Sequence, residues 1–204
     1  MLVDGVKDVF GTLGLGKPDI SLLDEQFLAQ IQKMPTRNLA AELLERLIAD
    51  QVKARGQKNA VQAKEFTQKL EEAIAKYQNR ALTTVEVIEE LIQLAKDMRA
   101  AGARGERLGL SEDELAFYDA LETNDSAVKV LGDDTLRAIA RELVETVRKN
   151  VTIDWTIREN VRAQLRVLVK RILRKHGYPP DKQEKATQTV LEQAEVLSEI
   201  WAGA

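Results

Sequence analysis

The sequence has no cysteine, only one histidine and few aromatic residues. Without cysteine, the 204-residue chain forms no disulfide, no thiolate metal site and no cysteine nucleophile, which suits a reducing compartment. One histidine leaves too few soft ligands for a zinc centre. Aromatic residues make up 4% of the chain, which is low for a protein that stacks many bases. We therefore expect no metal site in this chain, and only local contact with any nucleic acid.

Long apolar runs are also missing. No stretch approaches the roughly 20 uninterrupted apolar residues of a membrane span. The start, Met1–Gly5, lacks the charged and then apolar pattern of an export signal. We expect a soluble, cytoplasmic chain with no membrane partner.

Helical patterning runs through almost the entire sequence. Apolar residues recur at three- and four-residue spacing, alternating β-branched runs are few, and 44% hydrophobic content is enough for a sizeable core. Thr83 with Glu86 and Ser111 with Glu114 form capping-box patterns at two helix starts. The sequence therefore predicts an all-α fold, an irregular multi-helix bundle of one unit or of two packed helical subdomains.

The most loop-like internal segment is the glycine-rich stretch 102–109. We use it to divide the chain into a linker-like N-terminal segment 1–22, an N-terminal helical part 23–101 and a C-terminal helical part 110–204. The last part contains a basic helix over 155–176. No fixed-period repeat is present, which disfavours a solenoid.

Two motifs resemble catalytic sites, and each fails on a detail. Gly11–Lys17 has the spacing of a phosphate-binding loop, but Pro18 supplies neither the hydroxyl that holds magnesium nor a backbone N–H. Asp181 and Gln183–Lys185 resemble a metal-dependent nuclease cluster, but such sites take their acids from distant strands. Asp181 is better explained as a helix N-cap.

The remaining titratable groups give no nucleophile and base pair. Adjacent carboxylates such as Glu71 and Glu72 point about 100° apart on a helix and do not share a site. His176 falls in the last turn of the basic helix, where a cation is favourable, and the sequence shows no acid beside it. We predict no catalytic residue in this chain.

The predicted basic helix over 155–176 is the most informative element. Asp154 can cap it, and Gly177 is placed to end it before Pro179. Seven cations less two anions between Asp154 and Gly177 give +5, in a chain whose net charge is −3. At four-residue steps, each about 40° further round the helix, lie Arg158, Arg162, Arg166, Lys170 and Arg174. We expect an acidic surface to face this row.

Three counterparts fit the row. It can pair within the fold, for example with Glu192, Glu195 and Glu199 of the last helix or with Glu86, Glu89 and Glu90. It can also bind a protein partner or the phosphates of double-stranded DNA. Trp155 and Trp201 are either core residues or partner anchors, and a helical domain with so few aromatics favours the core.

Several blocks of the sequence resemble one known family in the same order. They are Gly5–Phe10, Gly16–Ser21, Leu43–Leu47, Lys76–Arg80, Asp154–Thr156, Arg162–Arg166 and Lys175–Asp181. Together they resemble the C-terminal helical region of the R subunits of type I restriction enzymes. The resemblance covers nearly the entire chain.

R subunits combine an endonuclease domain, an ATP-driven translocase on double-stranded DNA and a helical C-terminal part, and they join methyltransferase and specificity subunits. This chain resembles only the last part. The resemblance therefore implies a non-catalytic domain that docks the translocase and nuclease onto the methyltransferase–specificity core. The alternative is a module that contacts DNA phosphates through helix 155–176. ATP and magnesium are implied only for the whole subunit, a type I site-specific deoxyribonuclease, and no cofactor is expected here.

Overall fold

The computed structural model describes residues 25–123, 125–150 and 159–203. Every regular element in these ranges is helical, so the predicted all-α fold is confirmed. The linker 1–22, the Gly11–Pro18 motif, and the start of the basic helix with Trp155 lie outside the described residues. Within the described ranges, no helix combines the length and the apolar character that crossing a membrane requires.

The chain divides into two compact units, and each is described on its own. The first contains Met1–Val52 and Phe66–Ala100, and the second contains Lys53–Glu65 and Ala101–Ala204. Residues Lys53–Glu65 therefore belong to the second unit, although residues of the first unit precede and follow them in the sequence.

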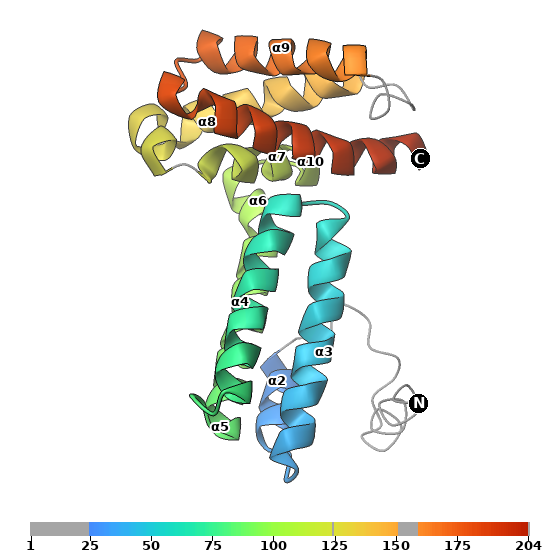
Figure 1. Ribbon diagram of the computed structural model, residues 1–204, viewed down its shortest axis with the longest axis vertical. Coiled ribbons are helices and arrows are strands. Elements are labelled where there is room, and N and C mark those ends of the chain that lie inside the picture. The colour runs from blue at the N-terminus through green and yellow to red at the C-terminus, as the bar shows by residue number, and fades with distance from the viewer. Residues whose placement is uncertain (1–24, 124, 151–158, 204) are drawn as a thin grey trace. The chain divides into compact units, whose positions relative to one another are not determined.

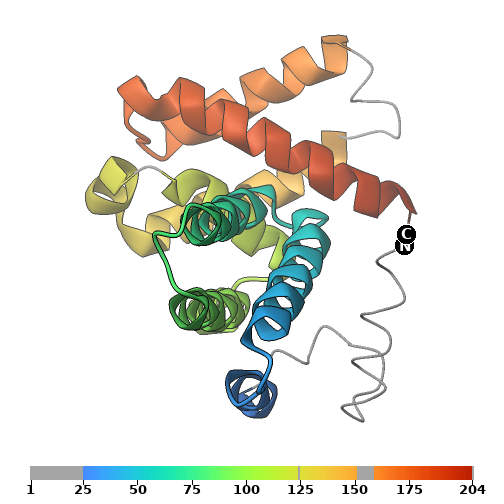
Figure 2. The ribbon, with the colours of Figure 1, turned by 60° about the horizontal axis from the view of Figure 1, so that its bottom comes forward.

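The first unit consists of α2 (Glu25–Gln32) and most of α3 (Arg37–Gly56), α4 (Ala60–Gln78) and α5 (Thr84–Gly102). Figure 2 shows α4 and α5, in green, nearly end-on. Apolar residues three and four apart give each helix one buried side. The core includes Phe27, Ile31, Leu44, Ile48, Phe66, Leu70, Ile88 and Leu91.

The start of α5 confirms one predicted capping box. The backbone N–H of Glu86 donates to the Thr83 hydroxyl at 3.3 Å, and the N–H of Thr83 donates to the Glu86 carboxylate at 2.7 Å. Hydrogen bonds from the Thr83 side chain and backbone lower the pKa of Glu86.

The second unit contains α6 (Arg104–Leu108), α7 (Glu112–Glu122), α8 (Asp125–Asn150), α9 (Glu159–Lys175), the 3₁₀ turn η2 (Pro180–Lys182) and α10 (Gln183–Gly203) (Figure 1). Helix α8 packs against α7 and α9, and α10 packs against the same two helices. Their apolar sides form one continuous core, which includes Phe117, Leu121, Leu136, Leu143, Val169, Leu173 and Leu197. The predicted capping box of Ser111 and Glu114 begins α7 and is confirmed.

Two local predictions were wrong. The segment 102–109, expected as a loop, contains α6. Helix α8 consists of two helical parts that meet at a kink at Gly132. Asp181 lies inside η2 and is not the cap of α10, since η2 supplies the chain reversal before that helix.

Candidate partner-binding surface

Helix α9 is held in the second unit by its apolar side and by its C-terminal end. Leu165, Val169, Ile172 and Leu173 are buried in the core. Gly177 adopts φ 71°, the left-handed conformation that ends many helices. The N–H of Tyr178 then donates to the Leu173 carbonyl at 2.9 Å, and the N–H of Gly177 donates to Arg174 at 3.0 Å. The predicted end of the basic helix at Gly177 is confirmed.

Tyr178 anchors this end of α9 against α7. Its side chain is 1% exposed, and its hydroxyl donates to the Leu121 carbonyl at 2.9 Å. The side-chain amide of Gln183 donates in turn to the Tyr178 carbonyl at 2.8 Å. The turn between α9 and α10 is therefore fixed by polar as well as apolar contacts.

Most of the predicted cation row is neutralised by α10. Arg162 lies 2.7 Å from Glu195, and Lys170 lies 2.6 Å from Glu184. Arg166 lies 3.9 Å from Glu184 and donates to Gln188 at 3.2 Å. The hydrogen bond and charge of Lys170, followed by the charge of Arg166, lower the pKa of Glu184. Of the carboxylates anticipated from the sequence, Glu195 is used, while Glu184 was not anticipated.

A second carboxylate holds the C-terminal turn of α9. Glu142 of α8 accepts two hydrogen bonds from Lys175, at 2.8 and 2.9 Å, and lies 2.7 Å from the His176 ring. These hydrogen bonds, that of Lys175 above all, lower the pKa of Glu142. The expectation that His176 has no acid beside it was wrong, because the acid comes from 34 residues earlier in the chain.

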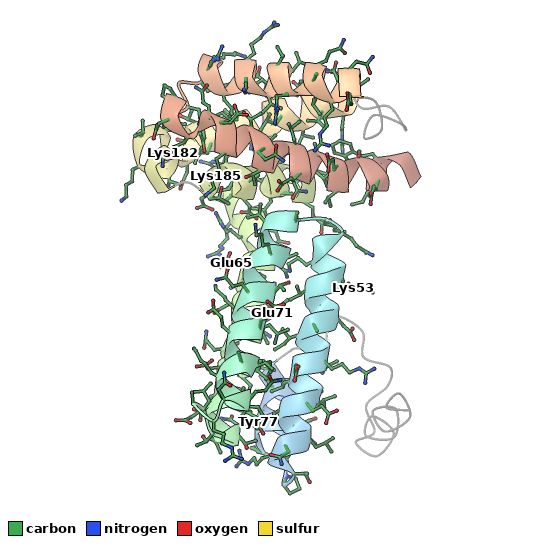
Figure 3. All side chains as sticks on the ribbon, viewed as in Figure 1. Lys53, Glu65, Glu71, Tyr77, Lys182 and Lys185 are labelled. Atoms are coloured by element: carbon green, nitrogen blue, oxygen red, sulfur yellow. The ribbon has the colours of Figure 1, made fainter. Side chains whose placement is uncertain are left out.

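The side of α9 that faces away from the core is open. With 100° per residue, Asn160, Ala163, Gln164, Val167, Arg171 and Arg174 share an arc of about 100°, and all six are exposed. We call these six residues the outer face of α9. Side chains tipped with nitrogen extend from this helix on the side away from α10 (Figure 3).

The outer face combines free charge with apolar surface. Arg171 and Arg174 form no ion pair with any residue that the structure describes. Val167 is 57% exposed. Next to it is an open depression of about 420 Å³, lined by Ala163, Gln164, Val167, Leu168 and Asn150 of α8.

The five row residues therefore differ in their surroundings. Arg158 lies outside the described residues, Arg162, Arg166 and Lys170 pair with α10, and Arg174 lies on the outer face. Arg171, which is not part of the four-residue row, is the residue that the row pattern missed. The sequence did contain an indication of its position: Arg171 comes four residues after Val167, on a side of the helix without apolar core residues. Partner binding by the row stays a prediction.

Trp201 lies at the edge of the core. It is partly buried, its indole N–H donates to Asp113 at 3.1 Å, and the Arg148 guanidinium lies over its ring at 4.9 Å. Asp113 also pairs with Arg148. These contacts account for Trp201 as a residue that fastens the end of α10 to α7 and α8.

A buried polar cluster joins the turn between α3 and α4 to α7 within the second unit. Asp119 accepts hydrogen bonds from Asn59 at 2.7 Å and from Gln62 at 2.6 Å. Arg104 lies 3.2 Å from the other oxygen of Asp119 and pairs with Glu122. Burial raises the pKa of Asp119, while the two amides and Arg104 oppose that rise. Sequence reasoning missed this cluster because its partners are about 60 residues apart.

The titratable groups of the described ranges do not gather into a metal site. No three His, Asp or Glu side chains there are placed to hold one ion. The polar contacts of the second unit instead join pairs of helices.

Residues 1–200 match the model of the family described as type I restriction enzyme HindI endonuclease subunit-like, C-terminal. The chain belongs to this family. The resemblance noted from the sequence blocks is therefore confirmed.

Two relatives of this chain are whole endonuclease subunits, and the chain matches only part of each. The chain is 44% identical over 200 residues to the type I restriction enzyme HindI endonuclease subunit of Haemophilus influenzae, which covers 98% of this chain and 19% of that protein. It is 35% identical over 171 residues to the putative type I restriction enzyme MjaIXP endonuclease subunit of Methanocaldococcus jannaschii, covering 83% and 16%. The chain thus spans about a fifth of their length. No solved structure matches it.

Proposed function

We propose that this chain is a docking domain, which attaches the endonuclease and translocase parts of a type I restriction subunit to a methyltransferase–specificity core. The observation that carries the proposal is that the chain corresponds to the C-terminal fifth of endonuclease subunits. In the whole subunit, ATP and magnesium serve the translocase and nuclease, and both activities reside outside these residues.

The surface of the second unit supports a docking role. Polar contacts within the unit are largely paired, as for Arg162 with Glu195 and Lys175 with Glu142. On the outer face of α9, by contrast with these pairs, Arg171 and Arg174 are exposed and form no ion pair with any residue that the structure describes. Protein interfaces combine such charged groups with apolar residues.

The alternative, a DNA-binding module, has weaker support. Three described members of the cation row already face carboxylates of α10, and Glu184 beside them is 66% exposed. A phosphate approaching these cations meets that negative charge as well. The row is therefore a poor phosphate-binding surface, although its charge in the sequence is high.

Equilibrium binding to the methyltransferase–specificity complex tests the proposed function. We expect this 204-residue chain to bind the complex saturably and stoichiometrically, and to bind a plain DNA duplex more weakly. A DNA-binding module would instead bind the duplex more tightly than the complex. Its log affinity for DNA would fall with log salt concentration, with a slope steeper by about 0.9 for each phosphate contacted. Failure to bind the complex at micromolar concentration contradicts the docking role.

A further inference from the structure

The outer face of α9 is unlike the rest of that helix. Where α10 covers α9, carboxylates meet the cations: Glu195 meets Arg162, and Glu184 meets Lys170 and Arg166. On the opposite side, no carboxylate in the described part of the chain pairs with the two exposed arginines, Arg171 and Arg174. On one side of α9, the carboxylates of a packed helix pair with the cations. On the outer face, Arg171 and Arg174 lack such carboxylates among the described residues.

The spacing of the unsatisfied groups fits a helix. Arg171 and Arg174 lie one turn apart, about 4.5 Å along the axis, and Val167 lies about 6 Å before Arg171. Carboxylates three or four residues apart on a facing helix match this separation. An apolar side chain one or two turns further along that helix reaches Val167 and the depression beside it.

The apolar part distinguishes a protein helix from nucleic acid. Val167 is 57% exposed, and Ala163 and Leu168 line the adjoining depression. Burying these side chains favours a partner with apolar groups, since each 100 Å² of apolar surface removed from water contributes about 2.5 kcal/mol. A phosphate backbone has no group to fill this depression.

We propose that the outer face of α9 is a docking site for an acidic amphipathic helix of a partner protein. Arg171 and Arg174 bind its carboxylates, and Val167 with the neighbouring depression receives its apolar side. This inference rests on the proposed function, and it names the surface and the partner chemistry through which docking occurs.

Matched variants test the surface. Arg171→Gln with Arg174→Gln removes two charges from the outer face. Lys182→Gln with Lys185→Gln removes two exposed charges, one at the end of η2 and one in the first turn of α10 (labelled in Figure 3). We expect the first pair to weaken binding to the methyltransferase–specificity complex at least about tenfold, and the second to change it by less than about twofold. Val167→Asp, which places a carboxylate in the apolar part, should weaken binding similarly. Thermal unfolding of each variant shows whether the fold is retained.

The outcomes separate the two proposals. If the wild-type chain binds the complex and neither Arg171→Gln with Arg174→Gln nor Val167→Asp weakens that binding, the docking surface is wrong and the docking function stands. If the wild-type chain does not bind, both fail. If the arginine variants weaken binding to a plain duplex as much as to the complex, the ligand is phosphate and the inference is overturned.

A photo-crosslinking residue at position 167 identifies the partner segment directly. We expect the cross-linked peptide to come from a protein subunit and to carry Asp or Glu residues three or four apart next to apolar residues. A cross-link to DNA, or to a basic segment, contradicts the proposed chemistry.

Discussion

Asp119 is a carboxylate with 4% of its surface exposed, and three side chains from outside its own helix surround it. A buried charge is tolerated only when it is paired and hydrogen bonded. Asn59 and Gln62 satisfy one oxygen, and Arg104 lies beside the other. Asp119 therefore attaches the turn between α3 and α4 to α7, beside the exposed ion pair of Lys58 with Glu112 at 2.7 Å.

Replacing Asp119 should destabilise the second unit strongly. Asp119→Ala leaves the two amides without their acceptor and removes one of the two carboxylates beside Arg104, and we expect it to lower the free energy of unfolding by about 3 kcal/mol. Asp119→Asn keeps a carbonyl for the two amides and should cost less. Urea denaturation measures both. Equal losses for the two variants contradict the assigned hydrogen bonds.

Glu142 gives the fold a dependence on pH. Its pKa in the folded state lies below the ordinary 4.5, because Lys175 and His176 donate to the ionised form. Folding therefore favours the ionised carboxylate, and this stabilisation is complete above the ordinary pKa and lost as pH falls through the folded value.

The expected result for Glu142→Gln is a loss of about 1 kcal/mol at pH 7, because the carboxylate is partly exposed and its ion pairs are screened. The difference from the wild-type chain should shrink towards pH 3. Urea unfolding across this pH range measures it. Glu145→Gln, on the same helix with an exposed ion pair, is the control and should change stability by less than about 0.5 kcal/mol. A difference that is constant with pH rules out the role assigned to Glu142.

At the scale of helices, two glycines shape the second unit. Gly132 has φ 72° and ψ 165°, a combination that is almost restricted to glycine, and it makes the kink in α8. Gly177 has φ 71° and ends α9, where some other residues are tolerated. Neither has an atom within 4 Å of where a Cβ would lie, so a substitution there acts through backbone strain alone.

Alanine should therefore lower the free energy of unfolding more at Gly132 than at Gly177. We expect Gly177→Ala to cost about 1 kcal/mol and Gly132→Ala to cost about 2 kcal/mol or more. Gly102→Ala, at the end of α5 with φ outside the left-handed region, should be neutral or slightly stabilising. Thermal unfolding gives all three values, and a reversed order for Gly132 and Gly177 contradicts the backbone assignment.

Local signals explain which elements could be predicted from the sequence. The capping boxes at Thr83 and Ser111 and the end of α9 at Gly177 depend on residues within a few positions of each other, and all three were predicted. The helix α6 was not, because its segment contains Gly105, whose lack of a side chain suggested a loop. A Cβ at Gly105 would lie 3.2 Å from the Leu110 carbonyl, so close packing favours this glycine.

The candidate site was only partly predictable, for a different physical reason. The +4 spacing located the cations correctly on one helix, but it could not show which of them α10 covers. Glu184 meets Arg166 and Lys170 only after the chain reverses at Gly177 and η2. The unpaired Arg171 emerged from three-dimensional packing and not from the row.

Across the whole chain, positive charge is concentrated in one helix, and most of it is paired with carboxylates of neighbouring helices. The net charge is −3, yet α9 carries six cations and one anion, a net of +5. Three carboxylates of α8 and α10 pair with four of these cations, because Arg166 and Lys170 share Glu184. The remaining two, Arg171 and Arg174, lie together on the outer face. A high local charge in the sequence therefore corresponds to a small free charge on the surface.

Two sets of variants should separate stability from binding. Arg162→Glu places a carboxylate against Glu195, and we expect it to lower the free energy of unfolding by about 1 kcal/mol, with most of the loss regained by Glu195→Arg. Its binding to the methyltransferase–specificity complex should change by less than about twofold, since Arg162 lies away from the outer face. Arg171→Gln with Arg174→Gln should do the reverse, leaving stability within about 0.5 kcal/mol while weakening binding. Urea denaturation and equilibrium binding on the same preparations measure both quantities. If Arg162→Glu weakens binding without destabilising the fold, the paired row and not the outer face contacts the partner.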